Sequence, residues 1–163
     1  MSFARYGALL HVPDLRAIAI ASIIGRLPIG MAGLAILLLM QSTRQSFVDA
    51  GLASGCYVTG LALIAPLLGR YIDRHGPRRV LVLSTLLYPI CMGLLIVTAL
   101  SATSRPLLAM VAFAAGASYP PITVCMRALI RQFLTDQAQQ QAAYSLESLI
   151  IELIFIFGPL LVE

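Results

Sequence analysis

Five long apolar runs determine what this chain can fold into. They cover residues 17–40, 50–69, 80–104, 106–126 and 142–162, and each contains few or no charged side chains. About 20 consecutive apolar residues in a helix are enough to cross the hydrocarbon core of a bilayer. Because 60% of the residues are hydrophobic and only 11% are charged, the composition excludes an ordinary soluble domain. The sequence therefore predicts an all-α fold, a polytopic membrane helical bundle of about five transmembrane helices.

The positions of the arginines predict how these helices are oriented. Loops on the cytoplasmic side of a membrane protein carry an excess of basic residues. If the amino terminus is cytoplasmic, two arginines lie outside, Arg44 and Arg105. The arginines that then lie at or near the inner face are Arg5, Arg16, Arg70, Arg74, Arg78, Arg79, Arg127 and Arg131. We therefore expect a multi-pass protein of the cell (inner or plasma) membrane, with the lipid bilayer as its partner and its amino terminus in the cytoplasm.

The same distribution accounts for the formal net charge of +4, so no nucleic-acid partner is expected. The three cysteines, Cys56, Cys91 and Cys125, lie singly in three different runs. The two histidines, His11 and His75, have no second ligand at the spacing of a metal site. We assign no catalytic residue, no metal and no cofactor, and we do not expect an enzyme.

Two charged residues lie deep inside the apolar runs. Arg26 is nine residues into the first run and Glu152 is ten residues into the fifth, which places both roughly 14 to 15 Å from the cytoplasmic end. A charged side chain at the centre of a bilayer costs about 2.5 to 3.5 kcal/mol on insertion scales, so each needs a compensating group. Arg26 and Glu152 could form a midplane ion pair, or share a water-filled cavity where substrate or a proton modulates them. A purely structural salt bridge is the alternative.

A second possible pair lies nearer the cytoplasmic side. Arg127, near the inner end of the fourth run, and Glu147, five residues into the fifth, are both shallow. We expect this pair to act as a fixed strut between neighbouring helices. In the fourth run, Tyr119 and Thr123 share a face with Arg127, and Pro120-Pro121 predict a bend. The residues assigned to a substrate or ion pathway are Arg26, Tyr119, Thr123 and Glu152.

A short charged segment separates the second and third runs. It contains two glycines, one acid and several bases, of which the informative residues are Gly69, Asp73, Arg74, Gly76, Arg78 and Arg79. Glycine allows a sharp turn and close helix approach, and Pro77 can begin the next helix. We therefore expect a tight cytoplasmic loop. Its pattern of glycine, acid, base, glycine and basic cluster resembles the loop between helices two and three of major facilitator superfamily (MFS) transporters.

The resemblance covers nearly all of the chain and implies a larger machine. MFS transporters have twelve helices, of which the first and fourth line the central cavity. The resemblance implies that Asp73 locks against the opposite half in one state, with Arg74, Arg78 and Arg79 in its charge network. Residues 1–163 would then be the N-terminal portion, helices 1 to 5, and its partner would be the missing C-terminal half.

The function that follows from this resemblance is secondary transport. We expect a small solute of unknown identity to cross the cell membrane by alternating access, and proton-coupled efflux is one form of such transport. The alternative is a stand-alone short membrane scaffold or interaction protein. Such a protein would oligomerise through small-residue helix faces such as that of Gly51 and Gly55.

Overall fold

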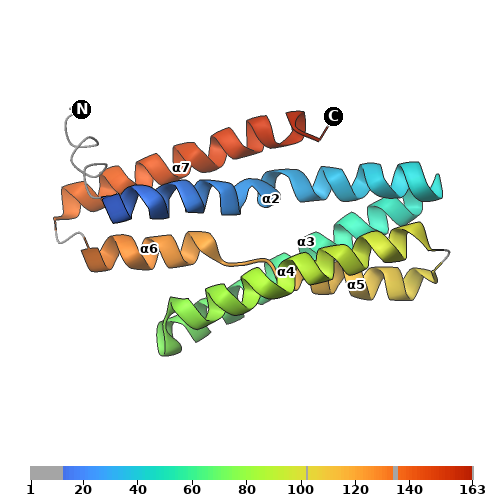
Figure 1. Ribbon diagram of the computed structural model, residues 1–163, viewed down its shortest axis with the longest axis horizontal. Helices are drawn as coiled ribbons and strands as arrows, with labels where there is room; N and C mark the ends of the chain where they lie inside the picture. Colours follow the sequence, from blue (N-terminus) through green and yellow to red (C-terminus); the bar gives the residue numbers. More distant parts are fainter. Residues whose placement is uncertain (1–12, 102, 134–135, 163) are drawn as a thin grey trace. The chain divides into compact units, whose positions relative to one another are not determined.

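Helices make up almost all of the regular structure. The computed structural model describes residues 13–101, 103–133 and 136–162, with the side chains of 13–21, 132 and 133 left undescribed; Arg5 and His11 lie outside these residues. The helices are α2 (Pro13–Arg44), α3 (Phe47–His75), α4 (Pro77–Leu100), α5 (Arg105–Ala117), α6 (Ile122–Phe133) and α7 (Gln137–Leu160) (Figure 1). Among the described residues, five helical stretches are long and apolar enough to cross a membrane. The predicted fold class, an all-α membrane bundle, is confirmed.

The chain divides into two compact units. The terminal unit contains the described residues up to Met31 and those from Ile122 onward, and the central unit is Ala32–Pro121. Helix α2 begins in the terminal unit and ends in the central unit. The chain returns from the central unit to the terminal unit after Pro121.

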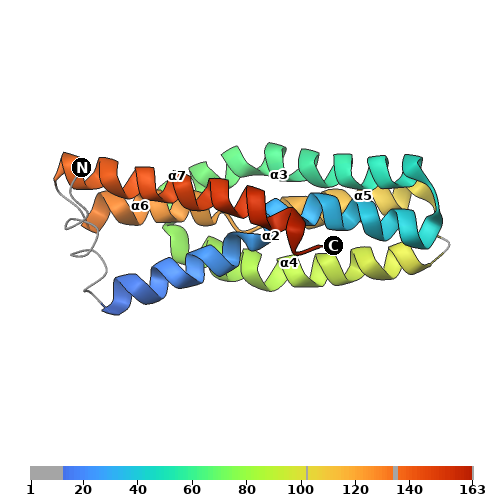
Figure 2. The ribbon, with the colours of Figure 1, turned by 90° about the horizontal axis from the view of Figure 1, so that it is seen from above.

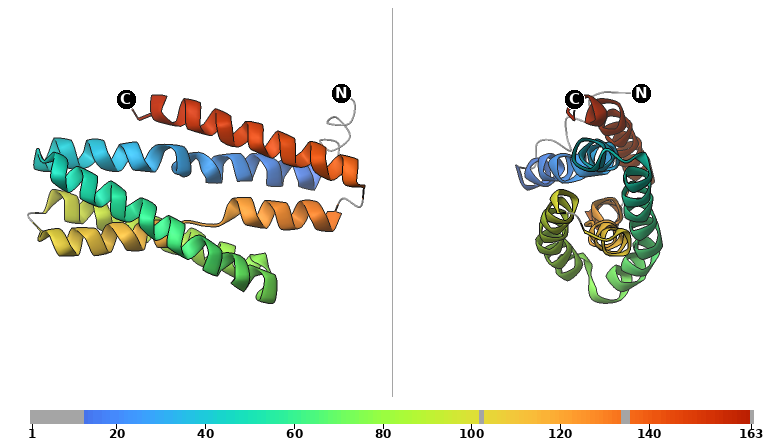
Figure 3. Two further views of the ribbon diagram at one scale, coloured as in Figure 1. Left: turned by 180° about the vertical axis from the view of Figure 1, so that it is seen from behind. Right: turned by 90° about the vertical axis from the view of Figure 1, so that its right-hand side faces the viewer.

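The central unit is built around the contact between α3 and α5. Helix α3 crosses α5 obliquely, and α4 packs against both (Figure 3). At the crossing, Gly60 faces the backbone of Phe113, and Gly116 faces the backbone of Tyr57. A Cβ atom at either glycine would collide with a main-chain carbonyl oxygen, so only glycine permits this approach. Leu95, Leu108 and other apolar side chains fill the space beside the crossing.

The fourth apolar run is divided into two helices. Helix α5 ends at Ala117, and α6 begins at Ile122 after a short extended segment (Figure 1). Pro120 and Pro121 provide no N–H groups for helical hydrogen bonds, and a proline disfavours helical geometry in the residue before it. The sequence predicts a bend here, and the structure has a complete break of the helix.

The terminal unit brings α2, α6 and α7 together. Helices α6 and α7 are neighbours (Figure 2). Helix α2 approaches α7 closely, because a Cβ on Gly30 would lie 2.6 Å from the Ile154 carbonyl oxygen. From the other side, a Cβ on Gly158 would lie 3.1 Å from the Gly30 carbonyl carbon. This contact sets the separation of the two helices that carry the charged residues described below.

The glycine contact in the central unit gives a direct test. We expect Gly116→Ala to destabilise the protein by about 1 to 3 kcal/mol, because the added methyl overpacks the α3–α5 crossing. Gly55→Ala is the matched control, because nothing lies within 4 Å of a Cβ at Gly55. Thermal unfolding of both variants in the same detergent measures the effect. Equal melting temperatures for the two variants would show that the crossing tolerates a Cβ.

Candidate functional site

A buried ion pair joins α2 to α7 in the terminal unit. Arg26 is 2% exposed and Glu147 is 5% exposed. The Nη2 group of Arg26 donates a hydrogen bond to Oε1 of Glu147. Both residues lie in helices that are long and apolar enough to cross a membrane. The charge of Arg26 is therefore compensated by a carboxylate from a segment 121 residues away in sequence.

The packing face of α7 explains why Glu147 is the partner. Glu147, Ile154 and Gly158 are the buried residues of this helix, and their spacing places them along one face. Because Ile154 and Gly158 contact Gly30, this is the face that α7 turns toward α2. Arg26 lies about one turn before Gly30, and long side chains in helices lean toward the N-terminus. The guanidinium therefore reaches back to Glu147.

The expected pairing of Arg26 with Glu152 is wrong in the structure. Glu152 is exposed, and among the described residues it makes no ion pair. At 100° per residue it lies roughly 140° around α7 from Glu147, away from the face that packs on α2. Agreement in depth was the basis of the prediction, but depth does not specify the direction in which a side chain points.

A third charge completes the cluster around Glu147. The Nε atom of Arg127 on α6 lies 3.5 Å from Oε2 of Glu147, and its side chain is 51% exposed. One carboxylate thus lies between two guanidinium groups, which leaves the three residues with a net charge of +1. Arg26 Nε and Glu147 Oε2 are buried without a hydrogen-bond partner. The cluster therefore has unused hydrogen-bonding capacity at two buried atoms.

Of the two polar residues predicted near the bend, Tyr119 lies in the segment between α5 and α6, and Thr123 lies in α6. Thr123 is half-buried in the first turn of α6, next to Ile122. Tyr119 is buried in the central unit, where its ring meets the edge of Tyr88 with centroids 5.5 Å apart. Tyr88 in turn shares a hydrogen bond of 3.1 Å with Tyr57.

The loop between α3 and α4 is shorter than expected, because most of the charged segment is helical. Helix α3 continues to His75 and α4 begins at Pro77, so Gly76 alone connects them. Gly76 has a φ of 83°, which glycine adopts without strain, and its N–H donates to the Ile72 carbonyl at 2.8 Å. The tight turn predicted from the glycines is thus a single residue.

The remaining residues of this segment belong to the helix ends. Gly69 lies in α3 with open space around its Cα, since nothing is within 4 Å of a Cβ placed there. Four charged side chains are exposed and, within the part of the chain that the structure describes, form no ion pair: Asp73, Arg74, Arg78 and Arg79. They are available to groups outside the described residues.

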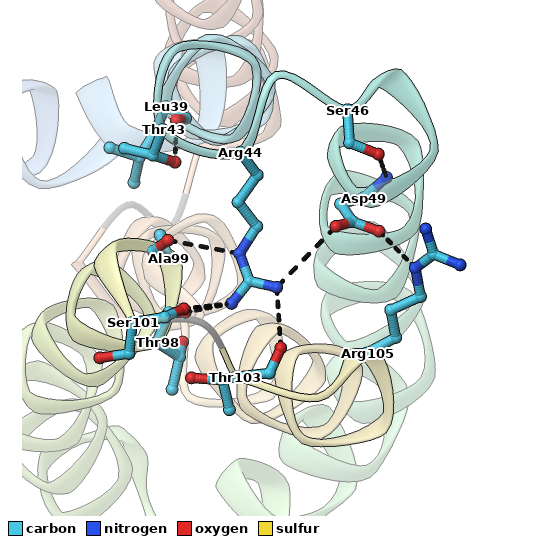
Figure 4. A network of polar contacts seen from close by, with 10 residues as sticks. All are labelled: Leu39, Thr43, Arg44, Ser46, Asp49, Thr98, Ala99, Ser101, Thr103 and Arg105. Carbon is cyan, nitrogen blue, oxygen red and sulfur yellow. Dashed lines mark hydrogen bonds and ion pairs between the residues drawn. The ribbon is translucent and has the colours of Figure 1, made fainter.

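Sequence reasoning missed a polar network in the central unit. Arg44, the last residue of α2, donates hydrogen bonds to four main-chain carbonyl groups at and beyond the C-terminus of α4 (Figure 4). These carbonyls belong to Thr98, Ala99 at 3.3 Å, Ser101 at 2.8 Å and Thr103 at 3.0 Å. Carbonyl groups at a helix C-terminus have no partner within the helix and carry partial negative charge. The N–H groups of Arg44 supply the missing hydrogen bonds, and its positive charge balances the partial negative charge of the carbonyl groups.

Asp49 extends this network to two more helices. Its carboxylate lies 3.8 Å from Nη1 of Arg44 and accepts a hydrogen bond of 2.7 Å from Nε of Arg105 (Figure 4). Arg105 is the first residue of α5. Ser46 caps α3 by accepting a hydrogen bond from the Asp49 N–H at 3.3 Å. The sequence signal was present in Ser46 followed three residues later by an acid, which is typical of a helix start. The partners of that acid could not be read from the sequence.

Comparison with known proteins identifies the family. The family model described as Major Facilitator Superfamily matches residues 18–163. The chain belongs to the major facilitator superfamily. It is therefore a multi-pass membrane protein of a transporter family, and MFS transporters are not enzymes. Searches of curated proteins and of solved structures returned no match.

The buried pair of this MFS protein gives a test of stability. We expect Glu147→Ala to destabilise the protein by about 3 to 5 kcal/mol, because Arg26 would remain buried without a counter-charge. Glu152→Ala, on the exposed face of the same helix, should change stability by less than about 0.5 kcal/mol. Thermal unfolding in one detergent compares the two. A larger loss for Glu152→Ala would assign the compensating carboxylate to Glu152.

The Arg44 network gives a second test. Arg44→Ala should cost about 2 to 3 kcal/mol, because it removes charged hydrogen bonds to the C-terminus of α4. Arg105→Ala removes an ion pair whose arginine is 63% exposed and should cost less than about 1 kcal/mol. The two melting temperatures would rank the contributions, and a greater loss for Arg105→Ala would contradict the role of Arg44.

Proposed function

We propose that this chain forms helices of a secondary transporter that moves a small solute across the cell membrane by alternating access. The observation that carries the proposal is the Arg26–Glu147 pair, a buried charge pair inside membrane helices of an MFS protein. Ionisable groups inside a membrane are expensive to insert and mark substrate and ion pathways. Alternating access requires a second repeat unit around a shared site, which the C-terminal half of a full-length transporter would provide.

The chemistry of the cluster favours an anionic solute. A guanidinium only donates hydrogen bonds, whereas a carboxyl group such as that of Glu147 is an acceptor when ionised and also a donor when it carries a proton. Protonation of Glu147 would release both guanidinium groups from the one carboxylate that they contact within the described residues. Arg26 and Arg127 could then bind a carboxylate or phosphate of the solute through charge-assisted hydrogen bonds. Deprotonation would restore the pair and expel the anion, which would couple solute movement to a proton.

The remaining pathway residues keep their proposed roles. Tyr119 and Thr123 lie in or beside the break between α5 and α6, where the chain can bend with little loss of helical hydrogen bonding. Glu152 presents a carboxylate on the exposed face of α7, where a second half of the protein could contact it. We propose that Tyr119, Thr123 and Glu152 contribute to the solute pathway of the full transporter, as Arg26 does.

The joint between α3 and α4 is the proposed gate. Its residues are Gly69, Asp73, Arg74, Gly76, Arg78 and Arg79. The exposed Asp73 and its neighbouring arginines would form ion pairs with the second half in one state and release them in the other. We place this joint and the amino terminus on the cytoplasmic side, because eight arginines would then lie inside and two outside.

Transport by the full-length gene product in proteoliposomes tests the proposal. A panel of small organic anions, neutral polar solutes and organic cations is presented with and without an imposed pH gradient. We expect uptake or efflux of an anion that depends on the gradient. Glu147→Gln should abolish this dependence, because its side chain cannot carry a proton, while Glu147→Asp should retain it.

Glu152→Gln is the matched control for the coupling mechanism. We expect it to keep the pH-gradient dependence, since Glu152 has no ion-pair partner in the described residues. Loss of coupling in Glu152→Gln with normal coupling in Glu147→Gln would move the proton site to Glu152. A thermal unfolding transition would show that the protein is folded. If such a protein gave no solute-dependent flux, the transport proposal would be overturned.

A further inference from the structure

A basic pocket lies on α3 close to its joint with α4. It is a shallow hollow of about 300 Å³ lined by Leu67, Arg70, Tyr71, Arg74 and His75. Two guanidinium groups, an imidazole and a phenol therefore surround a space with an aliphatic side chain at one end. No carboxylate lines it. Such a pocket can hold a phosphate group, because arginine presents paired N–H donors that match phosphate oxygens.

The helical spacing keeps Asp73, the acid of this segment of α3, away from the pocket. The five lining residues follow the i, i+3, i+4, i+7, i+8 pattern that forms one face of a helix. Asp73 lies roughly 130° from the centre of that face at 100° per residue. Arg70 and Arg74 are exposed and have no ion-pair partner among the residues that the structure describes. Within the described part of the chain, no carboxylate neutralises their charges.

The surroundings of the pocket are those of a lipid headgroup site. Helix α3 is one of the stretches able to cross a membrane, and the pocket lies in its last turns, which is where a spanning helix meets the headgroups. On the same face, toward the membrane interior, Leu63 is 58% exposed and Leu67 is 57% exposed. A lipid whose phosphate occupies the pocket could lay its acyl chain along these leucines. A free phosphate ion would make no use of them.

The rim of the pocket is held in place by an aromatic contact. The rings of Tyr71 and His75 stack with centroids 4.3 Å apart and an interplanar angle of 20°. This stacking orders two polar tips at the membrane surface, where amphipathic rings are favoured. Both side chains can donate hydrogen bonds to phosphate or glycerol oxygens.

We propose that this pocket binds the headgroup of an anionic phospholipid. Arg70 and Arg74 hold the phosphate, Tyr71 and His75 contact the polar backbone of the lipid, and Leu67 with Leu63 supports an acyl chain. The site does not depend on the proposed transport activity. It shares Arg74 with the proposed gate, whereas Arg70, Tyr71 and His75 belong to the pocket alone.

Native mass spectrometry of the full-length protein in detergent tests this site. Phosphatidylglycerol is titrated against phosphatidylcholine, and inorganic phosphate is added in a separate series. We expect phosphatidylglycerol to bind more tightly than phosphatidylcholine and phosphate alone to compete poorly. Arg70→Gln should raise the Kd for phosphatidylglycerol about fivefold, because each arginine near an anionic lipid surface contributes on the order of 1 kcal/mol.

Two further variants sharpen the result. Arg131→Gln is the matched control, because Arg131 is an exposed arginine near the C-terminal end of α6, as Arg70 is near that of α3, but lies outside the pocket. Its phosphatidylglycerol affinity should equal that of the unmodified protein. Arg70→Lys should bind more weakly than the unmodified protein, since lysine cannot make the paired contact.

Three outcomes would overturn the lipid site. Equal losses in Arg70→Gln and Arg131→Gln would mean a general surface-charge effect. Equal affinity for the two lipids would exclude recognition of an anionic headgroup. Competition by inorganic phosphate at the concentration of the lipid would make this a free-anion site. Unchanged melting temperatures would show that the lipid affinity of each variant was measured on folded protein.

Discussion

In hydrocarbon, helices gain little by hiding apolar side chains from each other, because lipid tails are equally apolar. Close backbone approach at a few glycines therefore decides how this chain packs. In the central unit, Gly60 and Gly116 let α3 and α5 touch along their main chains. In the terminal unit, Gly30 and Gly158 do the same for α2 and α7. Once these contacts are fixed, the faces on which the polar residues lie are fixed too.

The polar interactions of the two units differ in a way that matters for function. Arg44 is committed to four carbonyl groups and one carboxylate, so its hydrogen-bonding capacity is largely used in holding helix ends together. Arg26 has one carboxylate partner and a buried Nε with no hydrogen bond. A site that must exchange partners needs such spare capacity, while a structural clasp does not. This contrast is why the proposed transport chemistry centres on Arg26 and Glu147.

The joint of α3 and α4 serves two proposed contacts through different faces. By helical spacing Asp73 lies away from the pocket face, and it is exposed, as the proposed contact with a second half of a transporter requires. Arg70 and His75 belong to the pocket face, where lipid can reach them. Because Gly76 alone links α3 to α4, a contact on either face acts close to the connection between the two helices.

The sequence by itself determined the five membrane-spanning stretches, the family and the position of the charged joint. These follow from local properties: the length of apolar runs, the spacing of glycine, acid and base, and the inability of Pro120-Pro121 to continue a helix. Only the tertiary structure decided that Arg26 pairs with Glu147 rather than Glu152, and that Gly60 and Gly116 make the close contacts while Gly51 and Gly55 face open space. Depth along a helix can be counted from its residues, but the rotation of each helix about its axis depends on which neighbours it packs against.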